Sequence, residues 1–180
     1  FKVTSPVPGR PVAYNGQGVL ALQSGGKDSL LVATMLSNKG IKFTPWFVSS
    51  SGKYPSVIDQ LGESPLICTR TIDRENIQKA ISDGGLNGHV PITYIIQSLS
   101  IVQAILSGKN TIITSIGQEG EESHSKIGNL AINHQWSKTW DAEKEFAEYV
   151  KRYISPDIKI GSPLRQFSEL RIAELFVKHV

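Results

Sequence analysis

The stretch of sequence that decides the fold runs from Gly18 to Ser29 and reads GVLALQ followed by SGGKDS. Residues 18–23 form a short apolar run without polar alternation, which is typical of a strand buried on both faces of a sheet. Two adjacent glycines follow, and residues 28–38 then repeat apolar side chains at helical spacing. The stretch therefore predicts a strand, a tight loop and a helix, in that order.

The same alternation continues along the chain. Further strands are expected at 43–49, 65–72 and 110–116, with a short extended piece near 158–160. Helices are expected at residues 56–61, 74–82, 91–106, 139–154 and 171–180. Strands that alternate with helices are joined by right-handed crossovers and lie parallel. The sequence predicts an α/β fold, a doubly wound and mostly parallel sheet with helices on both faces, over residues 18–180 after a connecting segment at 1–17.

Charge and cysteine content narrow the possible functions. Nineteen Lys and Arg residues against 16 Asp and Glu give a net charge of +3, and the basic residues are scattered. This balance does not indicate a nucleic-acid partner, although it leaves a transfer-RNA substrate open. The single cysteine, Cys68, excludes an internal disulfide framework and a zinc site built from several cysteines.

Targeting signals are missing from the sequence. No apolar run reaches about 18 residues, and the first residues do not form a signal peptide. We therefore expect a soluble, cytoplasmic protein without a membrane partner. The chain begins with Phe1, and residues 171–180 form a helix-like run without a Gly or Pro exit signal. We expect it to be a piece of a longer protein.

The loop Ser24-Gly25-Gly26-Lys27-Asp28-Ser29 has the composition of an anion-binding site. Two glycines allow several backbone N–H groups to face one concavity, and the following helix directs its positive N-terminal end to the same place. Ser24 and Ser29 add hydroxyl donors, and Lys27 adds a charge. Ala21 stands where the Walker and dinucleotide motifs require a glycine, so neither motif fits. A turn that only joins a strand to a helix is the alternative.

The motif S-G-G-x-D-S after a first strand resembles the PP-loop ATP pyrophosphatases, a superfamily that includes NAD and GMP synthetases and tRNA-modifying adenylating enzymes. The resemblance extends from Gly18 to about Ile116. It implies that residues 24–29 hold the β- and γ-phosphates of ATP, with Ser49, at the end of the second strand, as a further nucleotide contact. An oxygen of the substrate would attack the α-phosphorus, and pyrophosphate would leave.

Such a reaction concentrates negative charge on the leaving pyrophosphate, so hydrogen-bond donors and Mg²⁺ would stabilise it. ATP and Mg²⁺ are therefore the expected cofactors. Lys27 and Asp28 are the expected catalytic residues of the loop, and Asp28 is also the expected Mg²⁺ ligand. Glu119, just beyond the fourth strand, is the second candidate ligand, because the carboxyl ends of the strands face one crevice. A solvated loop carboxylate is the alternative for Glu119.

Polar residues in the later part of the chain are candidates for substrate binding. They are Arg70, His89, Asn133, His134 and Lys138, near expected strand ends and helix starts. Singly, each fits a surface charge or a loop residue, but together they suit an anionic ligand with several groups. The segment 117–138 is long for a connection, and we expect it to be a mobile lid. A surface loop without a role is the alternative.

Four short patterns also resemble the MurL-type, ATP-dependent epimerases of UDP-N-acetylmuramoyl-L-alanyl-L-glutamate in peptidoglycan synthesis. They are R-T-I-D at 70–73, N-G-H-V-P-I-T at 87–93, Gln118-Glu119, and N-H-Q-W-S-K at 133–138. This resemblance implies adenylation of the terminal glutamate α-carboxylate, which acidifies the α-proton. A neutral histidine suits the proton transfer, and His134 or His89 could serve.

These epimerases are longer, so the chain would be their adenylating domain. Three alternatives stay open. The first is a ligase or amidotransferase synthetase of the same superfamily, and the second is a tRNA-modifying enzyme. The third is a nucleotide-binding module without chemistry.

Overall fold

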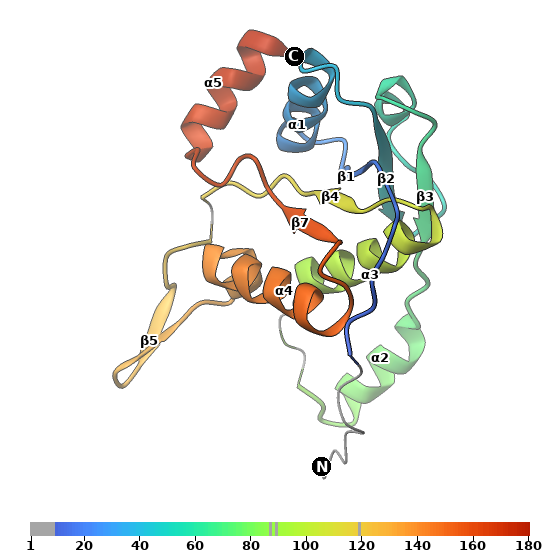
Figure 1. Cartoon of the computed structure of the whole chain (residues 1–180). Helices are drawn as coiled ribbons and strands as arrows, with labels where there is room; N and C mark the ends of the chain where they lie inside the picture. Colours follow the sequence, from blue (N-terminus) through green and yellow to red (C-terminus); the bar gives the residue numbers. More distant parts are fainter. Residues whose placement is uncertain (1–9, 87, 89, 119) are drawn as a thin grey trace.

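The computed structural model describes residues 10–86, 88, 90–118 and 120–180, and these build a five-stranded parallel sheet (Figure 1). The strands are β1 (Val19–Leu22), β2 (Phe43–Ser49), β3 (Leu66–Thr69), β4 (Thr111–Ile113) and β7 (Lys159–Gly161). They lie in the order β3-β2-β1-β4-β7. Each neighbouring pair is parallel. The predicted α/β class is confirmed.

Helices cover both faces of the sheet, as Figure 1 shows. On one face lie α1 (Lys27–Asn38) and α5 (Glu169–His179), which pack against each other and around Ala21. On the other face, α3 (Ile92–Leu106) and α4 (Trp140–Tyr153) pack around Leu20. Successive strand residues point to opposite faces, so Leu20 and Ala21 enter different cores. The sheet is therefore wound on both faces.

Side-chain caps fix where several helices begin. Asp73 accepts a hydrogen bond from the Asn76 N–H at the start of α2 (Arg74–Ser82). Thr139 and Ser168 cap α4 and α5 in the same way. The cap at Ser168 starts the last helix at Glu169, two residues before the predicted position. The segment predicted as a helix at 56–61 is a 3₁₀ helix, Ser56–Gln60, and a second one spans Trp136–Lys138.

Two connecting segments contain more order than the sequence predicted. Residues 10–17 have no regular secondary structure, but the Val12 N–H donates to the Ile154 carbonyl, and the Tyr14 N–H donates to Asp157. The expected lid contains a two-stranded antiparallel hairpin, β5 (Ser125–Ile127) and β6 (Leu130–Ile132). Among the described helices, none has both the length and the apolar character needed to cross a membrane.

Candidate functional site

The SGGKDS loop lies where the sheet topology creates a crevice. The chain leaves β1 to form β2 on one side, and β4 later pairs with β1 on the other side. The carboxyl ends of two strands that lead in opposite directions leave such a crevice, and ligands of open α/β sheets bind there. Ser24, Gly25 and Gly26 follow the carboxyl end of β1 and lead directly into α1. The predicted order of strand, loop and helix is confirmed.

The two glycines of the loop have different environments. Gly25 has φ +74°, and a Cβ there would lie 2.7 Å from the Pro55 Cγ. Both the backbone conformation and the contact with Pro55 therefore disfavour a side chain at this position. Gly26 has φ −90° and stands at the N-terminus of α1 without a side-chain cap. A Cβ there would meet only the Ser24 Oγ, at 3.3 Å. The uncapped first turn leaves N–H groups that suit an anion.

The hydroxyl groups of Ser24 and Ser29 form hydrogen bonds with the backbone of the loop. The Ser24 Oγ accepts a hydrogen bond from the Gly26 N–H at 3.2 Å and lies 3.2 Å from the Ser29 Oγ. The Ser29 Oγ donates to the Gly26 carbonyl at 3.0 Å and accepts from the Ser24 N–H at 3.2 Å. These bonds hold the backbone of the loop in the bent shape that a phosphate would contact.

Lys27 and Asp28 form an ion pair that also includes a residue of α5. The Lys27 Nζ lies 2.5 Å from the Asp28 Oδ1 and 2.7 Å from the Glu169 Oε2. The hydrogen bond with Asp28, and then the one with Glu169, raise the pKa of Lys27 above its usual range. The ammonium therefore stays charged beside the loop, and α5 supplies a carboxylate that the sequence analysis did not anticipate.

Two buried side chains at the crevice have polar atoms without hydrogen-bond partners. Gln23 follows β1 and Thr114 follows β4, and both are buried. In the described part of the chain, neither amide atom of Gln23 nor the Thr114 Oγ1 makes a hydrogen bond. Buried polar groups are nearly always paired, so unpaired ones call for an explanation such as water or a ligand. Both residues directly follow the neighbouring strands β1 and β4, whose carboxyl ends border the crevice.

A pocket of about 860 Å³ lies beside the loop. Its wall includes Glu169, which pairs with Lys27, so the pocket borders the loop. Other lining residues are Gln118, Glu121, Glu122, His124, Trp140 and Arg165. Most of them belong to the expected lid or to its ends.

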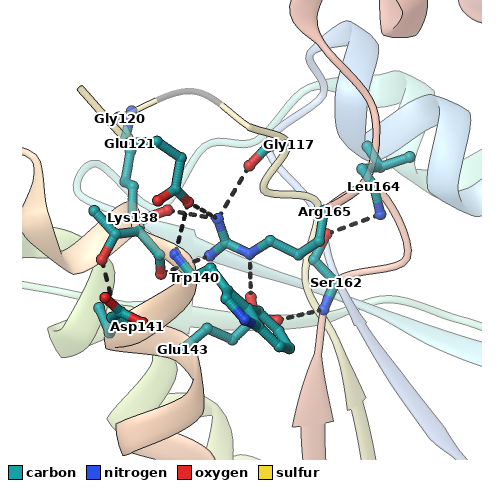
Figure 2. A network of polar contacts seen from close by, with 12 residues as sticks. Gly117, Gly120, Glu121, Lys138, Trp140, Asp141, Glu143, Ser162, Leu164 and Arg165 are labelled. Atoms are coloured by element: carbon teal, nitrogen blue, oxygen red, sulfur yellow. Dashed lines mark hydrogen bonds and ion pairs between the residues drawn. The ribbon is translucent and has the colours of Figure 1, made fainter.

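Arg165 joins both ends of the expected lid, as Figure 2 shows. Its Nη1 donates to the carbonyls of Gly117 (3.0 Å) and Lys138 (2.6 Å), and its Nη2 donates to the carbonyl of Thr139 (3.2 Å). Its Nε donates to the buried Glu143 at 3.0 Å, and Glu121 lies 3.6 Å away. Glu143 also accepts from the Ser162 N–H. The buried charge pair is thus hydrogen-bonded on both sides, and it fixes where the segment begins and ends.

The family model of the MurL N-terminal domain matches residues 4–162 of this sequence. The chain belongs to the MurL N-terminal domain family.

Curated relatives of this family are considerably longer than the chain. The chain is 30% identical over 154 residues to a UDP-N-acetyl-alpha-D-muramoyl-L-alanyl-L-glutamate epimerase of Xanthomonas oryzae pv. oryzae, covering 86% of the chain and 34% of the relative. For the epimerase of the same name from Salinispora tropica, identity is 29% over 170 residues, covering 93% and 37%. The chain therefore spans about a third of the length of these relatives.

One solved structure aligns with 89% of this MurL-family chain and is itself covered to 74%, with a TM-score of 0.45 and 19% identity. It is described as a predicted subunit of a tRNA methyltransferase from Methanocaldococcus jannaschii. The likeness is too low to carry a functional comparison.

The candidate substrate residues of this MurL-family chain lie in two places. Arg70 follows β3, at one edge of the sheet, and its Nε is buried without a hydrogen bond among the described residues. Asn133, His134 and Lys138 lie in the segment 117–138, whose two ends bond to Arg165. Arg165 follows β7, the strand at the opposite edge of the sheet from β3. The structure therefore does not bring Arg70 together with the other three. His89 and Glu119 lie outside the described residues.

Three of the candidate site residues contact other residues of the chain. Asn133 donates to the Gly120 carbonyl and accepts from the Gln135 N–H, so it ties the exit of the hairpin to its entry. The rings of His134 and His124 lie 4.0 Å apart, centre to centre. Ser49 is buried and donates to the Lys53 carbonyl at 2.6 Å, so its hydroxyl braces the loop after β2.

The Asp28 carboxylate at the loop could be one ligand of an Mg²⁺ ion that is otherwise held by phosphate oxygens and water. No cluster of three or more His, Cys, Asp or Glu residues with metal-binding geometry occurs in residues 10–86, 88, 90–118 and 120–180. Mg²⁺ is commonly held by one or two carboxylates plus substrate phosphates and water, and Asp28 offers such a carboxylate next to the first turn of α1.

Proposed function

We propose that the chain is the ATP-binding, adenylating part of an epimerase that inverts the terminal L-glutamate of UDP-N-acetylmuramoyl-L-alanyl-L-glutamate. The observation that carries the proposal is the loop at the β1–β4 crevice, where Gly25 and the uncapped first turn of α1 offer N–H groups to an anion. Gln23 and Thr114, which directly follow the two strands beside this crevice, also have buried polar atoms without hydrogen-bond partners among the described residues. The names of the curated relatives support the choice of substrate.

In this proposal, the loop binds the β- and γ-phosphates of ATP. An oxygen of the substrate α-carboxylate attacks the α-phosphorus, the bond from the α-phosphorus to the bridging oxygen breaks, and pyrophosphate leaves. The backbone N–H groups and the Lys27 ammonium stabilise the charge that develops on the leaving group. Mg²⁺, when bound, would neutralise phosphate charge, and Asp28 would hold it; Glu119 stays a second candidate.

The adenylate makes the α-proton of glutamate acidic, because the carboxylate charge has been removed. A base takes this proton, and the proton returns on the opposite face of the carbon. Hydrolysis of the adenylate then releases AMP and restores the carboxylate. His134 is our candidate for the proton carrier, since its ring packs on His124, which lines the pocket beside the loop.

Exchange of labelled pyrophosphate into ATP tests the adenylation step. With Mg²⁺ and UDP-N-acetylmuramoyl-L-alanyl-L-glutamate present, exchange should appear and AMP should be the nucleotide product. The matched control is UDP-N-acetylmuramoyl-L-alanine, which lacks the glutamate and should not support exchange. ADP as the main product would overturn the proposal, and ATP binding without any exchange would favour a nucleotide-binding module.

The variant Asp28→Asn separates chemistry from folding in the same assay. Asp28 is partly exposed, and Lys27 keeps its bond to Glu169 without it. The melting temperature should stay nearly unchanged, while stabilisation by Mg·ATP and the exchange rate should fall. An unfolded variant, or one with unchanged Mg·ATP affinity, would remove Asp28 from the metal site.

A further inference from the structure

The side chain of Glu169 binds the ammonium group of Lys27 beside the SGGKDS loop. Glu169 is the first residue of α5, and Lys27 is the first residue of α1. The two helices pack on one face of the sheet, Ser168 caps α5, and Ile172 is fully buried one turn later. The backbone that carries Glu169 is therefore held in place. Two carboxylates, from Asp28 and Glu169, share one ammonium group.

We propose that Glu169 competes with phosphate for Lys27 and transmits the occupancy of the phosphate loop to the neighbouring pocket. This inference rests on the proposed phosphate-binding function of the loop. A bound phosphate would repel the Glu169 carboxylate and attract the Lys27 ammonium, so the pair would separate. Lys27 has a flexible four-carbon stem and can turn toward the phosphate. The Glu169 side chain is 47% exposed, so its release costs little.

Release of Glu169 would change the wall of the pocket. The pocket is also lined by Glu121 and Glu122, and its arginine, Arg165, is already bonded to Glu143. A freed Glu169 adds an unpaired negative charge to this wall. Groups of a second ligand that donate hydrogen bonds to a carboxylate, such as hydroxyl, amide or ammonium groups, would then bind more tightly. By linkage, such a ligand would also strengthen phosphate binding.

Titration with inorganic pyrophosphate, followed by ¹H–¹⁵N NMR at low ionic strength, measures the competition directly. Glu169→Gln removes the competing charge and should tighten pyrophosphate binding about two- to fivefold, the range expected for a partly exposed ion pair. The matched control is Glu174→Gln on the same helix, which breaks an exposed pair with Arg171 and should leave the affinity unchanged. Equal or weaker binding by Glu169→Gln would overturn the proposal.

A double-mutant cycle distinguishes competition from a general charge effect. With Lys27→Met as the background, Glu169→Gln has no ammonium to release, so most of its gain should disappear. A gain of the same size in both backgrounds would mean simple repulsion between Glu169 and pyrophosphate, and would overturn the competition. Absence of pyrophosphate binding by the unmodified chain would overturn the phosphate-loop function itself. Binding by the unmodified chain together with no gain in Glu169→Gln would overturn only the role of Glu169.

Discussion

At the scale of single residues, the two adjacent glycines of the SGGKDS loop have different environments. Gly25 has a positive φ and a Cβ there would clash with Pro55, whereas Gly26 has an ordinary φ and a Cβ there would meet only the Ser24 hydroxyl. A glycine at the first position is therefore needed by the fold. At the second position, we propose that the absence of a side chain keeps the concavity open to a ligand.

Substitution by alanine should separate these roles. Gly25→Ala should lower the free energy of unfolding by about 1–2 kcal/mol or more, because an L-residue is strained at this φ and clashes with Pro55. Gly26→Ala should change the free energy of unfolding by less than about 0.5 kcal/mol, yet weaken pyrophosphate binding roughly tenfold. Urea unfolding and pyrophosphate titration of both variants test this. Equal losses of stability would contradict it.

At the scale of elements, Arg165 determines how the segment 117–138 is attached to the fold. It bonds to carbonyls at both ends of the segment and to a glutamate of α4. The hairpin between these ends is exposed, apart from the partly buried Ile132. We therefore expect the hairpin to move while its two ends remain fixed.

Removing the contacts of Arg165 should lower the free energy of unfolding far more than breaking a surface ion pair does. Arg165→Met leaves the buried charge of Glu143 without its ion-pair partner, so the free energy of unfolding should fall by about 3–5 kcal/mol. The control Arg171→Met breaks an exposed pair with Glu174 and should cost less than about 1 kcal/mol. Adding Glu143→Gln to Arg165→Met should recover part of the loss. Similar, small losses for both single variants in urea unfolding would show that Arg165 does not hold the ends of the segment in place.

The motion of the segment can be followed by hydrogen exchange. Without ligand, amides of the hairpin should exchange quickly, because few apolar contacts hold it. Mg·ATP together with UDP-N-acetylmuramoyl-L-alanyl-L-glutamate should slow exchange within 117–138, since closure of the segment would keep water from the adenylate. Fast exchange that does not change in the fully liganded protein would mean that the segment is a surface loop rather than a lid.

Local signals explain which elements could be predicted from the sequence. The apolar run before Ser24 and the helical spacing after it predict β1 and α1, because both patterns depend on neighbours in the chain. The hairpin was missed, since its short strands are mainly exposed and do not alternate clearly. The pair Gly128-Asn129 between them is a hairpin signal that could have indicated it.

At the scale of the whole molecule, the site combines residues that no local pattern connects. Glu169 meets Lys27 from 142 residues away, and Arg165 meets the Gly117 carbonyl from 48 residues away. These contacts arise because α5 packs on α1, and because Arg165, after β7, bonds to both ends of the segment 117–138. Such long-range placement explains why the sequence predicted the strand, loop and helix around SGGKDS but not the residues of the neighbouring pocket.

The central claim is that the loop after β1 binds the pyrophosphate part of ATP. The most direct test is a crystal structure of the chain with Mg²⁺ and α,β-methylene-ATP, which cannot release pyrophosphate. We expect the β- and γ-phosphates to lie against the N–H groups of Gly25 and the first turn of α1, with Lys27 turned away from Glu169. A nucleotide bound elsewhere, or bound with its terminal phosphates away from this loop, would contradict it.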